Sequence, residues 1–171
     1  MNAPQDLKPS VLSETDRQEL AAVREYGGKD THISGDESPW FNWVGEIEVK
    51  ILRIDNRTGT FVLGLRSPSD QWLGKHRHRG IVTATTIAGS WNYREYDWVA
   101  RPGDYVVETP GTIHTLHVAA NTEIVYTVTG SIEFFNEDDS LSSVWDCFSF
   151  TNHYMQHCKR TGLAVNRRLF Y

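Results

Sequence analysis

The segment from residue 46 to residue 135 constrains the fold most, because short alternating stretches follow one another there between turn residues. Ile47, Val49 and Ile51 alternate with charged side chains, which predicts a strand with one buried and one solvated face. After this first strand (46–54), strands are expected at residues 60–66, 72–88 with a break near Gly80, 90–99, 105–109, 113–118 and 123–135. Many short strands with frequent turns predict an all-β sandwich or barrel, here a double-sheet jelly roll.

A short helix is expected before this β region and another after it. Ser13 can cap the stretch SETDRQELAAVREY, which Gly27-Gly28 can end. Residues 148–160 can form a second helix, with Gly162 as its left-handed cap, and residues 163–171 can add a final strand. The chain is therefore expected to be a single domain with three parts: an arm and short helix that pack on the barrel (1–45), the barrel itself (46–135), and a C-terminal helix and tail (136–171).

Composition excludes several classes of partner. The formal net charge of the 171 residues is -5, and no run of Lys and Arg is present, so neither nucleic acid nor an anionic membrane is expected as a partner. No apolar stretch is long enough to span a membrane, and the N-terminal residues are polar. Cys147 and Cys158 are too far apart for a Cys-x-x-Cys motif and are expected to be free thiols in a reducing cytoplasm.

Three histidines form the candidate chemical site. His76 and His78 are separated by one residue, so on a strand both side chains point to the same face. His114 follows the Pro110-Gly111 turn and can come from a neighbouring strand. Imidazoles from two adjacent strands can then converge on one metal ion at about 2.0–2.1 Å per bond. Three neutral ligands leave the full charge of a divalent metal in place, which favours a substrate that binds as a chelating anion.

These two segments resemble the cupin family, whose motifs are G-x5-H-x-H-x3,4-E-x6-G and G-x5-P-x-G-x2-H-x3-N. His76, His78 and Gly89 match the first motif, and Gly103, Gly111 and His114 match the second. Three positions depart from the pattern. Val82 stands where the family has a metal-binding Glu, Thr109 stands at the Pro, and Val118 stands at the Asn. The resemblance therefore implies a cupin barrel whose metal ligands are His76, His78 and His114, without a carboxylate at position 82.

The run from Trp72 to His117 and the tail TNHYMQHCKRTG resemble more closely the bacterial 2,4'-dihydroxyacetophenone dioxygenases, which are single-cupin iron enzymes. That resemblance implies a non-haem Fe(II) dioxygenase whose partners are O2 and an aromatic α-hydroxyketone. The expected reaction cleaves 2,4'-dihydroxyacetophenone into 4-hydroxybenzoate and formate. A homodimer or homotetramer is expected, since many cupins are homo-oligomers.

Further residues near the histidines are candidates for roles in the reaction. Tyr93 and Glu108 are expected to be catalytic groups that move protons, and Glu95 is an alternative carboxylate ligand. The sequence contains six Trp, seven Tyr and seven Phe, and four of these aromatics are expected to bind the substrate: Trp72, Trp91, Tyr105 and Tyr126. Packing in the core or against another subunit is the alternative for each of them.

The other histidines are expected to be structural. His117 lies three residues after His114, so on a strand it faces away from the metal. His153 and His157 have a spacing that can bind a metal on a helix, but no third ligand is spaced to join them. Two alternative functions remain for the three-histidine site: a dioxygenase acting on a β-diketone, or a non-catalytic metal-binding sensor of the anti-sigma type.

Overall fold

The computed structural model describes residues 9–28 and 30–170. The chain divides into two compact units, Met1–His32 and Ile33–Tyr171. The first unit contains a 3-10 turn (Pro9–Val11) and helix α1 (Glu14–Tyr26), which begins and ends where the sequence predicts. The Ser13 hydroxyl accepts a hydrogen bond from the Asp16 amide, and the Asp16 carboxylate accepts one from the Ser13 amide, so the helix start is fixed on both sides. Packing of residues 1–45 on the barrel stays a prediction, and residues 1–8 of the expected arm lie outside the described residues.

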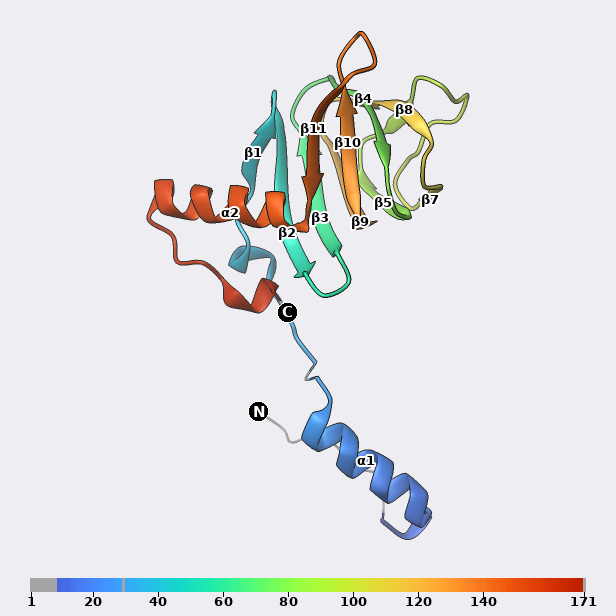
Figure 1. The fold of residues 1–171 in the computed structure, drawn as a ribbon, viewed down its shortest axis with the longest axis vertical. Coiled ribbons are helices and arrows are strands. Elements are labelled where there is room, and N and C mark those ends of the chain that lie inside the picture. Colours follow the sequence, from blue (N-terminus) through green and yellow to red (C-terminus); the bar gives the residue numbers. More distant parts are fainter. Residues whose placement is uncertain (1–8, 29, 171) are drawn as a thin grey trace. The chain divides into compact units, whose positions relative to one another are not determined.

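The second unit contains two antiparallel sheets that face each other, as the sequence predicts (Figure 1). In spatial order, the six-stranded sheet consists of β1 (Phe41–Val44), β2 (Ile47–Asp55), β3 (Thr60–Ser67), β9 (Thr122–Thr129), β5 (Val82–Ala88) and β7 (Tyr105–Glu108). The five-stranded sheet consists of β11 (Leu141–Asp146), β10 (Ser131–Phe135), β4 (Gln71–His78), β8 (Ile113–Val118) and β6 (Trp91–Tyr93). The strands β1 and β11 lie outside the expected barrel range of residues 46–135 and extend one edge of each sheet.

Two of the expected long strands are divided between the sheets. The stretch 72–88 becomes β4 and β5, and the stretch 123–135 becomes β9 and β10, with Gly80 and Gly130 at the two crossings. A Cβ at Gly80 would lie 2.1 Å from the Thr129 carbonyl oxygen, and Gly130 has a φ of 84°, so both crossings depend on glycine. The expected strand 90–99 is paired only over β6, and the residues after Tyr93 form a loop.

A β-bulge at Gly74 sets which side chains of β4 point inward. Leu73 pairs with Leu116 and Lys75 pairs with Thr115, so Gly74 is an extra residue with no partner on β8. The side-chain alternation therefore shifts by one, and Leu73, His76 and His78 are buried while Trp72 is exposed. This shift turns the two histidines toward the core between the sheets.

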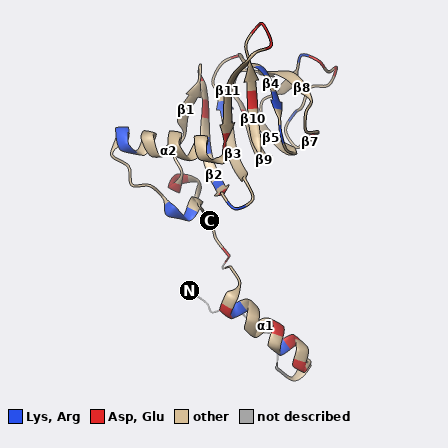
Figure 2. Ribbon diagram, viewed as in Figure 1, with Lys and Arg blue, Asp and Glu red and all other residues tan. Residues whose placement is uncertain are grey.

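Helix α2 (Cys147–Thr161) packs on β2 and β11. The Asp146 carboxylate accepts a hydrogen bond from the Ser149 amide at its start, and Gly162 ends it with a φ of 72°, as predicted. Figure 2 shows both signs of charge on the barrel. The basic Lys159 and Arg160 lie in the last turn of α2, where the helix dipole favours them. The longest helices of the described residues, α1 and α2, are too short and too polar to cross a membrane.

The tail after α2 differs from the expected strand over residues 163–171. It contains a 3-10 turn (Arg167–Leu169), and its pairing with the sheet is a single parallel bridge between Phe170 and Ile54. The Asn166 side chain accepts a hydrogen bond from the Arg168 amide, which favours a turn over an extended chain. Tyr171 lies outside the described residues.

Candidate metal centre

The three predicted histidines meet between the sheets. Each of His76, His78 and His114 offers one ring nitrogen, and these atoms all lie within 4.8 Å of one another. His76 and His114 are direct partners in the β4–β8 register, so their side chains start side by side on the same face. Their exposed fractions are 2% for His76, 6% for His78 and 2% for His114. Burial of three imidazoles at one point requires a partner that satisfies their nitrogens.

Some ring nitrogens of this cluster have no hydrogen-bond partner among the described residues. Nδ1 of His76 lies 2.8 Å from the Gly74 carbonyl oxygen, and donation there leaves Nε2 as an acceptor. His78 Nδ1 and His114 Nε2 are buried without a hydrogen-bond partner among the described residues. Burial lowers the pKa of His76 to about 3 and that of His114 to about 4, with the neighbouring histidines adding to the shift at His76. Both rings are therefore neutral near pH 7, which is the form that binds metals.

Glu108 brings a carboxylate to the same point. It pairs with Val82 in the β5–β7 register, so its side chain emerges beside the position that lacks the family's Glu. Its Oε2 lies 3.1 Å from His78 Nε2 and 3.7 Å from His114 Nε2, yet it has no hydrogen-bond partner among the described residues. Burial alone would raise the pKa of Glu108, but the neighbouring His78 and the Tyr93 hydroxyl outweigh it, and the pKa is lower than 4.5. Glu108 is therefore ionised at neutral pH.

The cluster fits a divalent transition metal. Three neutral imidazoles and one carboxylate oxygen are ligands that Fe, Zn, Ni and related ions accept. Glu108 Oε2 and His114 Nε2 are buried, unpartnered and 3.7 Å apart, and His78 Nε2 lies 3.1 Å from the same oxygen, so one bound cation would satisfy them together. The cluster consists of residues predicted from the sequence, but the sequence alone did not decide between Glu95 and Glu108.

Tyr93 connects the cluster to its surroundings. Its hydroxyl donates a 2.5 Å hydrogen bond to Glu108 Oε1, and its ring stacks on His114 with 3.8 Å between centroids and 4° between planes. Burial raises the pKa of Tyr93 well above 10, so the hydroxyl keeps its proton. Tyr93 therefore orients both a histidine and the carboxylate.

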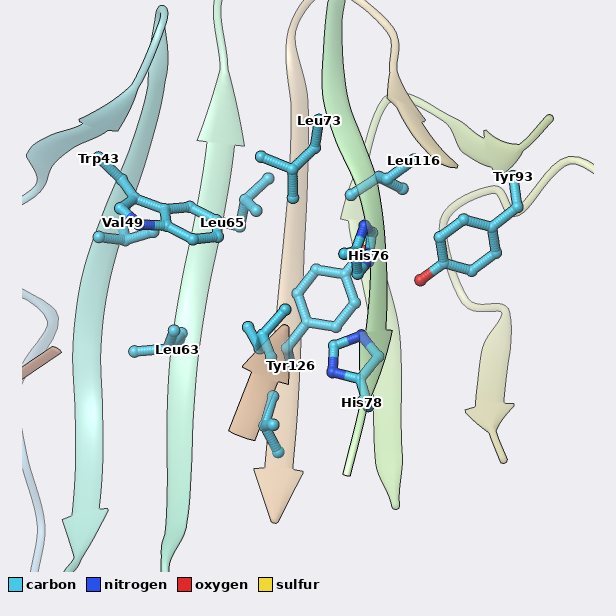
Figure 3. Close-up of a pocket in the computed structure, with 12 residues that line it drawn as sticks. Trp43, Val49, Leu63, Leu65, Leu73, His76, His78, Tyr93, Leu116 and Tyr126 are labelled. Carbon is cyan, nitrogen blue, oxygen red and sulfur yellow. The ribbon is translucent and has the colours of Figure 1, made fainter. Parts of the chain in front are cut away.

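Two cavities contact different members of this cluster. The inner cavity has a volume of about 40 Å³ and is mainly apolar; Figure 3 shows it between the two sheets, with His76, His78 and the hydroxyl of Tyr93 on one side. Its lining residues are Trp43, Val49, Leu63, Leu65, Leu73, His76, His78, Tyr93, Leu116, Tyr126, Val128 and Ile132. The outer pocket has a volume of about 130 Å³ and a more polar lining, formed by Tyr93, Tyr96, Trp98, Val106, Val107, Glu108, Thr109, Thr112 and His114. Tyr93 is shared by both.

The four aromatics expected at the substrate occupy different places. Tyr126 lines the inner cavity. Trp91 is fully buried behind Tyr93, and its indole nitrogen donates to the Thr86 hydroxyl at 2.8 Å, which is a packing role. Trp72 and Tyr105 point to the outer faces of their sheets, with exposed fractions of 53% and 64%, and line neither cavity. Their placement does not support the substrate contact expected for them.

The other candidate side chains make contacts outside the histidine cluster. Glu95 accepts a hydrogen bond from the Thr115 amide at 2.9 Å and so holds a loop to β8. His117 lies on the outer face beside Trp72, with 4.6 Å between ring centroids. Tyr96 and Trp98, which line the outer pocket, were not singled out in the sequence, although their alternation with Asp97 places two aromatics on one side of an extended segment.

Comparisons with known proteins place the chain among cupins. A family model described as the ChrR cupin-like domain matches residues 28–133, which is more than half of the chain. No curated protein matches the sequence. An RmlC-like cupin protein from Ralstonia eutropha has a similar structure, with a TM-score of 0.77, 26% identity and coverage of 82% of this chain and 94% of the other.

Two further solved structures carry a reaction in their names. An acetylacetone dioxygenase from Acinetobacter johnsonii is 15% identical, with a TM-score of 0.67 and coverage of 75% of this chain and 92% of the other. A proposed acetylacetone dioxygenase from Methylibium petroleiphilum is 18% identical, with a TM-score of 0.69 and coverage of 74% and 94%. At these identities the likeness shows the shared fold. The matched domain, the two facing sheets and the buried histidine cluster show that the chain belongs to the cupin superfamily, in the family of ChrR cupin-like domains.

Proposed function

We propose that the protein is a non-haem Fe(II) dioxygenase that cleaves the C–C bond of an aromatic α-hydroxyketone, with 2,4'-dihydroxyacetophenone as the model substrate. The observation that carries the proposal is the pair of buried, unpartnered atoms on His114 and Glu108, two residues that line the outer pocket, with His78 Nε2 3.1 Å from the Glu108 carboxylate. The acetylacetone dioxygenases of the same fold support a reaction of this type.

The outer pocket suits the aromatic ring of the substrate by size and the rest of it by polarity. Its volume of about 130 Å³ is close to that of an engineered apolar cavity that takes benzene, which is about 150 Å³, so it has room for one ring. Tyr96 and Trp98 stack on each other at 5.6 Å along its wall and offer a surface for a flat ring. Thr109 and Thr112 on the opposite wall offer hydroxyl groups for the polar end of a substrate.

A bound Fe(II) would supply Lewis acidity for a chelating ketone and hydroxyl, together with the capacity to reduce O2. Glu108 is ionised and lines the pocket, so it can accept the proton that leaves the hydroxyketone as an enediolate forms. The Tyr93 hydroxyl, which already donates to Glu108, then holds that carboxylate in one orientation. Addition of O2 across the cleaved bond gives an aromatic carboxylic acid and formate, with all atoms of the ketone and of O2 accounted for.

Two alternatives rest on the comparisons. A β-diketone substrate is favoured by the names of the acetylacetone dioxygenases, and such a substrate also chelates a metal as an anion. A sensor role without turnover is favoured by the match to the ChrR cupin-like domain. A purely structural metal site is closed, whereas this cluster has an ionised carboxylate and a pocket beside it. These two features support a reaction over a structural role.

The test is anaerobic reconstitution with Fe(II), followed by measurement of O2 uptake with a panel of aromatic hydroxyketones and β-diketones. Uptake with hydroxyketones and weak uptake with diketones is the expected result. The reverse order would select the diketone alternative. If none of the panel consumes O2 while iron remains bound, the dioxygenase proposal is wrong and the sensor role is favoured.

A further inference from the structure

We propose that the inner cavity is a binding site for dioxygen, in which the Tyr126 hydroxyl donates a hydrogen bond to the bound gas. This inference rests on the proposed function, and it assigns the two substrates of the reaction to different cavities at the cluster. His76 and His78 line the inner cavity, whereas His114 and Glu108 line the outer pocket. A small gas and an organic chelator could then reach the cluster without competing for one space.

Volume decides what the inner cavity can hold. At about 40 Å³ it is far smaller than the cavity of about 150 Å³ that takes benzene, so an aromatic ring does not fit. A single water needs only about 10–15 Å³, but it also needs two to four polar partners. A diatomic gas needs little space and few partners. The lining residues carry only two buried, unpartnered polar atoms, His78 Nδ1 and the Tyr126 hydroxyl, which is the minimum for a water. The mainly apolar lining by valine, leucine and isoleucine side chains excludes the ring and favours a small apolar molecule such as dioxygen.

Tyr126 gives the cavity a hydroxyl donor. It extends from β9 between Ile124 and Val128 of the same inward face, and Figure 3 shows its ring beside His78. Its hydroxyl is buried and has no hydrogen-bond partner among the described residues. The other hydroxyl in the lining, that of Tyr93, donates to Glu108. An unpartnered phenol in an apolar cavity costs stability, and a ligand that accepts its hydrogen bond would offset that cost. Donors of this kind beside a metal favour oxygen binding in other proteins.

The cavity also has a plausible point of entry for a gas. Trp43 is half-buried, and each of the other lining residues is buried. Its ring makes edge contacts with Phe134 and Trp145, with 6.0 Å and 5.5 Å between centroids. An apolar wall of this kind admits small apolar solutes when side chains fluctuate, and it excludes ions and larger polar molecules.

The test combines xenon binding with the kinetics of the iron-loaded protein. Apolar cavities of this kind bind xenon, so crystals under xenon pressure should show one xenon atom beside Tyr126. In Val128→Ile the added methylene fills part of the cavity, and both the xenon and the affinity for O2 should fall. In Tyr126→Phe the xenon should remain while the KM for O2 rises about fivefold, as expected for the loss of one hydrogen bond. The KM for the organic substrate should not change in either variant.

A matched control is Val125→Ile, on the outward face of the same strand, which should leave xenon occupancy and both KM values unchanged. Normal turnover with an unchanged KM for O2 in both variants, or no xenon in the unmodified protein, would overturn the dioxygen site while leaving the proposed function intact. If instead no organic substrate consumes O2, the proposed function itself is wrong and the dioxygen assignment falls with it. In that case, bound xenon would still show that the inner cavity is accessible and apolar, and its absence would show a closed core.

Discussion

Two histidine pairs in this chain have spacings that can bind metals, but their side chains have different surroundings in the fold. His76 and His78, two residues apart on β4, join His114 in a buried cluster whose nitrogens are partly unpartnered. His153 and His157, four residues apart on α2, are used in packing. His153 Nε2 lies 2.8 Å from the Asn42 carbonyl oxygen, and the His157 ring stacks on Phe41 at 5.1 Å. Spacing is compatible with metal binding in both pairs, but among the described residues only the first pair includes a ring nitrogen that is buried without a partner.

The difference follows from what each element faces. The α2 pair meets β1, a strand whose backbone carbonyl needs a donor, so an imidazole N–H satisfies a structural demand. The β4 pair faces side chains from the opposite sheet, where the Glu108 carboxylate, a candidate ligand, lies 3.1 Å from His78 Nε2. A buried histidine is thus a ligand candidate when its surroundings leave a nitrogen without a partner.

The largest effect is expected when one histidine is removed from the buried cluster, compared with the removal of one histidine from α2. His114→Ala should lose bound iron and lower turnover by more than about 100-fold, because even residues that only support a metal ligand contribute about 10–100-fold. His153→Ala should keep both and lose only about 1 kcal/mol of stability with the hydrogen bond to Asn42. Metal analysis and thermal unfolding of the two variants measure this contrast. Full iron content in His114→Ala would remove the basis of the comparison.

A smaller effect is expected at the carboxylates. Glu108→Gln should weaken iron binding and lower turnover, each by about 10–100-fold, because the neutral amide is a poorer ligand and no base. Glu95→Gln is the matched control, since the amide can still accept the hydrogen bond from Thr115. Iron titration and steady-state kinetics measure both. Equal behaviour of the two variants would mean that Glu108 has no special role.

Tyr93 should affect turnover more than metal content. Tyr93→Phe keeps the stacking on His114 but removes the donor to Glu108, so turnover should fall by about tenfold while bound iron stays constant. Trp72→Phe, on the outer face of β4, should leave KM and kcat unchanged. Steady-state kinetics and metal analysis of both variants measure this difference. Unchanged kinetics in Tyr93→Phe would return this residue to a packing role.

The smallest effect is expected on the outer face of the five-stranded sheet, where Glu133 of β10 pairs with Arg77 of β4. Glu133 accepts hydrogen bonds from Arg79 at 2.7 Å and from Arg77 at 2.6 Å, and these hold its pKa below the usual 4.5. Glu133→Gln should cost at most about 1 kcal/mol of stability near pH 7, since the arginines are partly solvated. A depressed pKa stabilises the fold above pH 4.5, so the difference between the two proteins should vanish as the pH falls through the folded-state pKa. A difference that grows on acidification would show the opposite linkage.

The sequence predicted those parts of the site that depend on local pattern. The alternation of His76 and His78, the turn before His114, the cap at Ser13 and the left-handed Gly162 are each set by a few neighbouring residues. The inward face of Glu108 also follows from alternation along β7. Its meeting with the histidines required the pairing of β7 with β5, which no local pattern specifies.

The placements that the sequence did not anticipate have physical causes in the same terms. Without a bulge, Trp72 would lie on the same face as His76, and the extra residue at Gly74 reverses it. Tyr105 was expected in the pocket together with Glu108, but positions three apart on a strand face opposite ways. The loop with Tyr96 and Trp98 is not an extended strand, so the wall of the outer pocket depends on tertiary contacts between aromatic rings.

The measurement that tests the central claim most directly is the fate of labelled O2 in the iron-loaded protein with an aromatic hydroxyketone. If the histidine cluster and Glu108 support oxidative cleavage, O2 uptake should equal product formation, and mass spectrometry should find one labelled oxygen in the aromatic acid and one in formate. A product whose new oxygen comes wholly from water, under conditions in which exchange is excluded, would contradict the account.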